Sequence, residues 1–120
     1  MTVGDPVVQW QILSKEPEKH ANFYSAVFGW TINAENPLGY RMANTESGRG
    51  IGGGFWPAPP EASAMVQLFV EVTDMTETIS KVTHNGGSIL IPPQTLPQGE
   101  QMAILRDPMG LTFGVMMPAK

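Results

Sequence analysis

The sequence predicts an α+β fold built from two βαβββ modules that follow one another along the chain. Segments with alternating apolar and polar residues indicate strands, and two segments with apolar residues at helical spacing indicate helices. The order of strand, helix and three strands occurs once and then repeats. Landmark residues support a duplication, since Gln9 corresponds to Gln67 and Gly54 corresponds to Gly114. We therefore expect one domain made of module 1 (about 5–56), a linker (57–63) and module 2 (about 64–117).

Module 1 begins with a predicted strand at residues 7–13, where Val8, Trp10 and Ile12 share one face. A helix follows, because Pro17 suits a first helical turn and Gly29 suits the position after a helix end. Its expected buried stripe has helical spacing and consists of His20, Phe23, Tyr24, Val27 and Phe28. Three short strands are predicted at 30–34, 40–44 and 51–56. Residues 57–63 (PAPPEAS) are predicted to be a linker outside the ladder, because proline has no N–H to donate.

Module 2 repeats this order. Its first strand is predicted at residues 65–72, with a shared apolar face of Val66, Leu68, Val70 and Val72. Asp74 with Glu77 three residues later resembles a capping box, and Met75, Thr78, Ile79 and Val82 keep helical spacing as far as Gly86. Strands are predicted at 88–91, 101–105 and 111–117, and the turn RDPMG (106–110) joins the last two.

Composition excludes several classes of function. A chain of 120 residues with net charge -4 and seven scattered Lys and Arg residues is not expected to bind nucleic acid. The absence of cysteine excludes disulfides and thiolate chemistry. The N-terminal segment lacks the pattern of a signal peptide, and no apolar stretch approaches the roughly 20 residues that span a bilayer. We therefore expect a cytoplasmic protein without a membrane partner.

Two motifs join the repeated order in pointing to a family. The segment FYSAVFGWTI (23–32) and the closing LRDPMGLTFGVM (105–116) make the chain resemble the vicinal oxygen chelate superfamily. This superfamily includes glyoxalase I, extradiol dioxygenases, methylmalonyl-CoA epimerase, fosfomycin-resistance enzymes and bleomycin- and mitomycin-binding proteins. The resemblance implies curved mixed sheets that enclose a cleft, and a homodimer. It also implies helices on the outer faces of the sheets, which would bury Val8, Trp10, Ile12, Val66, Leu68, Val70 and Val72. FYxxxFGW and RDPxG mark the fold rather than one activity.

The resemblance also implies where a ligand would bind, because the inner faces of the sheets would line the cleft. Strand alternation places on these faces Gln9, Gln11, Gly52, Gly54, Trp56, Gln67, Phe69, Glu71, Thr112, Gly114 and Met116. Metal-dependent members take His or Glu ligands from the first, fourth, fifth and eighth strands. In this chain those positions carry Gln9, Gly54, Gln67 and Gly114. Carboxamides are weak ligands and glycine offers no side chain, so we expect no metal, no cofactor and no metal-dependent catalysis.

Single residues on these faces allow more than one interpretation. Trp56, Phe69 and Met116 could form an apolar wall for a flat ligand, or could only pack the dimer seam or the cleft floor. Gln9 and Gln67 could hold a ligand's polar edge, or be solvated remnants of a metal site. Glu71 could act as a general base if it were buried, although a lone carboxylate is more often solvated. His20 is expected to be a partly buried histidine on the helix, with its hydrogen bonds made and no functional role.

The glycine run of Gly52, Gly53 and Gly54 is not followed by a helix, which argues against a phosphate-binding loop. The missing side chain at Gly54 is expected to leave space for an organic guest beside Trp56. The sequence thus favours a metal-free protein that binds a flat or aromatic small molecule and sequesters an antibiotic or a metabolite. One alternative is a glyoxalase-, dioxygenase- or epimerase-type enzyme with a non-standard or differently aligned metal site. A second alternative is a non-catalytic domain that binds a protein partner.

Overall fold

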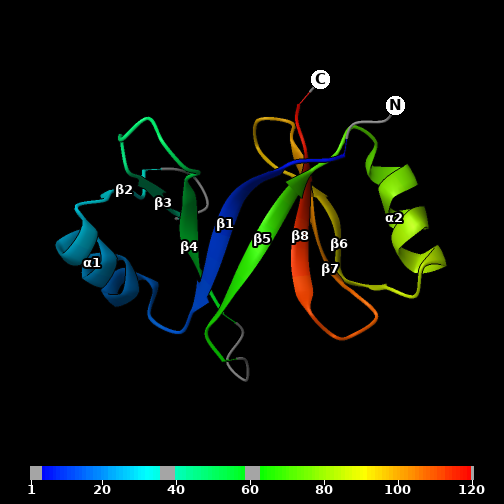
Figure 1. The fold of residues 1–120 in the computed structure, drawn as a ribbon, viewed down its shortest axis with the longest axis horizontal. Helices are drawn as coiled ribbons and strands as arrows, with labels where there is room; N and C mark the ends of the chain where they lie inside the picture. The colour runs from blue at the N-terminus through cyan, green and yellow to red at the C-terminus, as the bar shows by residue number, and fades with distance from the viewer. Residues whose placement is uncertain (1–3, 36–39, 59–62, 120) are drawn as a thin grey trace. The chain divides into compact units, whose positions relative to one another are not determined.

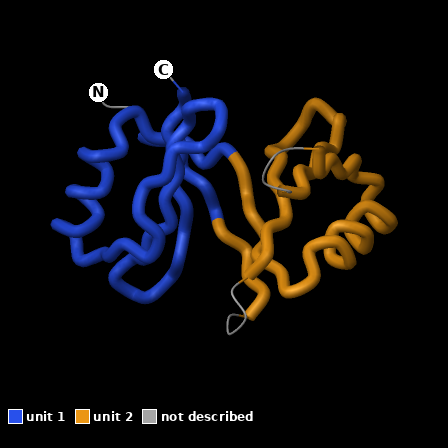
Figure 2. The backbone as a smooth tube through the Cα atoms, turned by 180° about the vertical axis from the view of Figure 1, so that it is seen from behind, with its two compact units in different colours: residues 1–8, 68–120 blue, residues 9–67 orange. Residues whose placement is uncertain are grey.

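The computed structural model describes residues 4–35, 40–58 and 63–119, which contain two helices and eight strands in the predicted order (Figure 1). The chain forms two compact units (Figure 2). Unit 1 comprises residues 1–8 and 68–120, and unit 2 comprises residues 9–67. Strands β1 (Val7–Ser14) and β5 (Met65–Glu71) each have residues in both units. The predicted α+β class with a repeated βαβββ order is confirmed.

Unit 2 contains most of β1, followed by α1 (Pro17–Phe28), β2 (Thr31–Asn33), β3 (Arg41–Asn44) and β4 (Gly53–Pro57). The strand order is β2-β3-β4-β1, in which β1 pairs with β4 in parallel and the other neighbours pair antiparallel. Residues on one face pack with α1 into a core of Ile12, Ala21, Ala43 and Phe55, flanked by Trp10, Tyr24, Trp30 and Ile32. The predicted alternation of β1 is therefore confirmed for Trp10 and Ile12.

Helix α1 begins and ends as predicted, but its buried stripe is different. Gly29 adopts a left-handed conformation (φ 75°) and donates its N–H to the Ser25 carbonyl at 2.8 Å. Ala21 is 1% exposed, whereas Phe23, Val27 and Phe28 are 55–59% exposed. The stripe that faces the sheet passes through Ala21 and the partly buried His20 and Tyr24, because a small side chain at Ala21 lets the helix approach the sheet closely.

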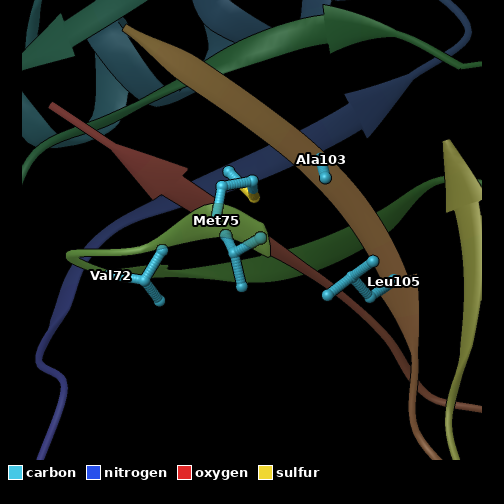
Figure 3. Close-up of a cluster of buried hydrophobic side chains, with 5 residues drawn as sticks. Val72, Met75, Ala103 and Leu105 are labelled. Carbon is cyan, nitrogen blue, oxygen red and sulfur yellow. The ribbon is translucent and has the colours of Figure 1, made fainter. Parts of the chain in front are cut away.

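Unit 1 contains most of β5, followed by α2 (Met75–His84), β6 (Ser88–Thr95), β7 (Gln101–Arg106) and β8 (Thr112–Met117). The strand order is β5-β8-β7-β6, with β5 and β8 parallel and the other neighbours antiparallel. Its core consists of Val72, Met75, Ala103, Leu105 and Val115, four of which are labelled in Figure 3. Among the described residues, neither helix has the length and apolar content needed to cross a bilayer.

The apolar face of β5 is buried only in its second half. Val70 and Val72 join the core with Ile79 and Val82 of α2. Val66 and Leu68 are 62% and 51% exposed, so the prediction that they are buried was wrong. The reason is that alternation predicts which face a residue occupies, but not how far along the strand a covering helix extends.

Proline limits the strands less than the sequence suggested. Strand β6 continues through Pro92 and Pro93, with register shifts on both sides of Ile91. It is the last strand in the order of unit 1, and proline is tolerated at edges and bulges. Strand β4 likewise includes Pro57, after which the Ala58 N–H donates to the Ser14 carbonyl at 2.8 Å. Of the predicted linker (57–63), residues 59–62 lie outside the described residues.

The N-cap of α2 is confirmed and provides a test of local stability. The Asp74 Oδ1 atom accepts the Glu77 N–H at 3.0 Å. Replacing Asp74 with Ala should lower the free energy of unfolding by about 1 kcal/mol, because the N–H loses its acceptor. Thermal unfolding measures this loss. Asp74→Asn is the matched control because asparagine retains a cap oxygen, and equal losses in both variants would contradict a capping role.

Candidate functional site

A polar pair lies buried in unit 2. The Gln11 Nε2 atom donates to the Gln67 Oε1 atom at 3.2 Å, and the two residues are 5% and 2% exposed. Buried carboxamides must be hydrogen-bonded to avoid a large desolvation cost, so each side chain stabilises the other. Gln9, which the sequence placed with them, is half-buried. Gln67 is therefore not a solvated remnant of a metal site.

An aromatic ring fills the position at Gly54. The parallel register pairs Gln11 with Gly54 and Leu13 with Trp56, so these residues share the face of the sheet opposite the helix-packed core. A Cβ atom added to Gly54 would lie 2.5 Å from the Cε1 and Cζ atoms of Tyr40 and 2.7 Å from its hydroxyl oxygen. The expectation that Gly54 leaves open space is therefore wrong. The Tyr40 ring occupies that volume.

Tyr40 and Met42 are the residues on this face that sequence reasoning missed. Tyr40 packs against Trp56 with ring centroids 5.4 Å apart and an interplanar angle of 51°. Met42 pairs with Gly54 across β3 and β4 and is 52% exposed. Alternation along residues 40–44 was the available signal, because it places both side chains on one face.

Burial changes the acidity of Tyr40. Desolvation disfavours the phenolate and raises the pKa of the Tyr40 hydroxyl to about 12. The phenol therefore stays neutral across the physiological range. It can contribute a ring and a hydroxyl dipole to this face, but it is not poised to act as a general base near neutral pH.

The equivalent face of unit 1 is also closed by a ring. Phe69 pairs with Gly114 across β5 and β8 and is 1% exposed. A Cβ atom on Gly114 would lie 2.5 Å from the Phe69 Cζ atom and 2.6 Å and 2.7 Å from its two Cε atoms. Glu71 pairs with Met116 in the same register, and both are half-buried. The predicted residues of this unit thus share one face, with Phe69 packed into it.

The four positions assigned to metal ligands do not fit a divalent ion. They offer two neutral carboxamides and two glycines, whereas zinc and similar ions require imidazole, carboxylate or thiolate donors. Gln67 is already hydrogen-bonded to Gln11, and rings cover both glycines. In residues 4–35, 40–58 and 63–119, no three His, Cys, Asp or Glu side chains converge on a point.

His20 lies on the face of unit 2 that packs with α1, and its partner there is Ser14. Its Nδ1 atom lies 2.7 Å from the Ser14 Oγ atom, which also accepts the Glu16 N–H at 3.0 Å. The imidazole packs 5.8 Å from the Tyr24 ring and 5.9 Å from the Phe55 ring. Ser14 is 2% exposed, so the pair ties the end of β1 to the start of α1 and does not present a nucleophile.

Comparison with known proteins identifies the family. Residues 7–115 match the profile of the Glyoxalase/Bleomycin resistance protein/Dioxygenase superfamily. The chain belongs to this superfamily. This membership confirms the family that the two motifs indicated. The chain is also 29% identical over 111 residues to a protein named "Putative glyoxylase CFP32" in Mycobacterium tuberculosis and Mycobacterium bovis. The match covers 91% of this chain but 42% of those relatives, so the chain spans less than half of their length.

Several solved structures share the fold at low sequence identity. A hypothetical protein, BH1468 from Bacillus halodurans, superposes with a TM-score of 0.69 at 16% identity, covering 98% of this chain and 97% of that one. Methylmalonyl-CoA epimerase from Mycobacterium tuberculosis gives 0.66 at 14% identity, covering 100% and 94%. The epimerase from Streptomyces coelicolor gives 0.65 at 16% identity, covering 97% and 99%. At these identities the likeness establishes the fold alone.

The acidity of Tyr40 leads to a prediction about stability at alkaline pH. Its folded pKa of about 12 lies above the ordinary value of 10.0, so the native state binds more protons than the unfolded state between these values. The stabilisation is complete below pH 10 and is lost as pH rises toward 12, by an amount on the order of 2 kcal/mol. Denaturant unfolding of the wild type and of Tyr40→Phe at several alkaline pH values measures it. Identical pH profiles for the two proteins would contradict the assignment to Tyr40.

Proposed function

We propose that this chain binds a small, flat organic molecule without a metal ion, and that it holds this molecule rather than transforming it. Membership of the superfamily supports the binding of a small molecule, and the residues of the site support binding without a metal ion or catalysis. A role in sequestering an antibiotic or a metabolite would follow from such binding. The observation that carries the proposal is the aromatic pair of Tyr40 and Trp56 on the sheet face opposite the helix-packed core of unit 2.

The aromatic pair offers a surface suited to a planar guest. Trp56 is half-buried and rests on the Tyr40 ring at 5.4 Å, so its indole is held in place while part of it stays accessible. Met42, 52% exposed and paired with Gly54, adds a thioether that adapts to different shapes. Offset stacking on such rings contributes roughly 0.5–1.5 kcal/mol per pair beyond burial of the area.

The polar groups of this face favour binding over chemistry. Gln11 and Gln67 are neutral, and so is the Tyr40 phenol, whose pKa burial raises further from neutrality to about 12. Among the described residues that register or alternation places here, from Gln9 to Gln67, none is a histidine or a carboxylate. General acid–base catalysis needs a group whose pKa lies near the working pH. The face can instead supply stacking and apolar burial, and the half-buried Gln9 adds a carboxamide that can bond to a ligand.

Replacing Trp56 with Ala tests the proposed wall. A panel of planar aromatic compounds is first screened by thermal shift, and we expect at least one compound to raise the melting temperature of the wild type. For that compound, Trp56→Ala should weaken the dissociation constant about tenfold, as expected for the loss of roughly 1.4 kcal/mol. Isothermal titration calorimetry measures the change. Met109→Ala is the control, because Met109 is 88% exposed in the turn between β7 and β8. A screen without any stabilising compound, or equal weakening by both variants, would contradict the proposal.

Metal analysis of the purified protein tests whether binding occurs without a metal ion. With carboxamides and glycines at the expected ligand positions, we predict less than stoichiometric Zn²⁺, Ni²⁺, Mn²⁺ or Fe²⁺ by mass spectrometry. Incubation with EDTA should leave the melting temperature and the affinity for the aromatic compound unchanged. One tightly held divalent ion per chain, with ligand affinity lost on chelation, would favour the metal-dependent enzyme instead.

A further inference from the structure

Each unit contains a glycine whose missing side chain is replaced by a neighbouring ring. We infer that Gly54 with Tyr40, and Gly114 with Phe69, are ring seats: strand positions at which any side chain must displace an aromatic ring, because the ring occupies the volume that the side chain would take. These are two of the four positions at which the superfamily's metal-dependent members would carry a ligand. A ligand side chain introduced at either position would therefore have to displace the ring of Tyr40 or Phe69.

Backbone conformation does not explain these glycines. The glycines with positive φ in the described chain are Gly29, Gly48, Gly50, Gly86, Gly99 and Gly110. Gly54 and Gly114 lie in regular strands instead, paired in register with Gln11 and Phe69. A residue with any side chain could adopt their backbone angles, so their requirement for glycine is one of space.

The space is closed in both cases by the far end of a ring. At Gly54 the atoms nearest to an added Cβ are Cε1, Cζ and the hydroxyl oxygen of Tyr40, at 2.5–2.7 Å. At Gly114 they are Cζ and the two Cε atoms of Phe69, also at 2.5–2.7 Å. Non-bonded carbon atoms prefer about 3.5–4.0 Å, so even alanine requires the ring to move.

The two rings reach their glycines from different strands. Phe69 lies on β5, the parallel neighbour of β8, and pairs directly with Gly114. Tyr40 immediately precedes β3, the antiparallel neighbour of β4. The residue of unit 2 that corresponds to Phe69 in register is Gln11, which bonds to Gln67. Equivalent holes are thus filled from opposite sides, which indicates that filling the hole matters more than which strand supplies the ring.

The inference does not depend on a bound molecule, so stability measurements test it separately from the proposed function. Gly114→Ala should lower the melting temperature by about 5 °C or more, because overpacking displaces the Phe69 ring. In a Phe69→Leu background the same substitution should cost less than half as much, because leucine lacks the Cε and Cζ atoms that meet the added methyl group. Gly114→Glu should be more destabilising than Gly114→Ala, and Phe69→Leu should relieve part of that loss as well.

A second double-mutant cycle combines Gly54→Ala with substitutions of Tyr40, and it includes a variant that keeps the ring. Tyr40→Leu removes all three clashing atoms and should make Gly54→Ala less costly, whereas Tyr40→Phe removes only the hydroxyl oxygen and should give little relief. Gly4→Ala is the control for replacing glycine as such, because an added Cβ there meets nothing within 4 Å. Relief in both cycles supports the inference. It is overturned if Gly54→Ala and Gly114→Ala are as harmless as Gly4→Ala, or if each costs the same whether or not its ring is present. If Phe69→Leu does not fold, the Gly54 cycle decides by the same criteria.

Discussion

The parallel pairing of β1 with β4, and of β5 with β8, is the constraint on which the candidate site depends. It brings the first and last strands of each module side by side and fixes which residues share a face. Gln11 consequently lies opposite Gly54, and Phe69 opposite Gly114. A slip by one residue would exchange the two faces and bring Trp10 and Phe55 out of the core. The cores of the two units, which hold α1 and α2, therefore also secure the register of the opposite faces.

Much of the fold could be predicted because local sequence patterns determine where its helices and strands begin and end. Alternation located the strands, Pro17 and Gly29 bounded α1, and Asp74 marked the start of α2. The errors arose where a tertiary contact decides. Ala21 faces the sheet in place of Phe23 because the closeness of packing, rather than hydrophobicity, selects the stripe. Val66 and Leu68 are exposed although Val70 on the same face packs against the core, because alternation predicts the face of a residue and not what covers it.

The candidate site was predictable as a set of faces but not as a set of contacts. Register places Gln11, Gly54 and Trp56 on one face of unit 2, and Phe69, Glu71, Gly114 and Met116 on one face of unit 1. The match to the family profile confirmed the resemblance. The pairing of Gln11 with Gln67 and the ring of Tyr40 over Gly54 depend on residues that are distant along the chain. A glycine in the sequence suggests empty space beside the backbone, whereas only the three-dimensional packing shows which neighbouring side chain fills that space.

A ring seat also constrains the mutational routes open to the chain. Introducing a ligand side chain at Gly114 while Phe69 remains forces two groups into one volume. Removing the Phe69 ring first leaves a cavity in a residue that is 1% exposed, which is destabilising as well. Whichever of the two substitutions comes first, the single mutant is less stable than the starting protein. The seat at Gly54 imposes the same requirement on Gly54 and Tyr40. The two glycines thus constrain substitution, because a side chain fits at either position without overpacking only if the ring beside it changes as well.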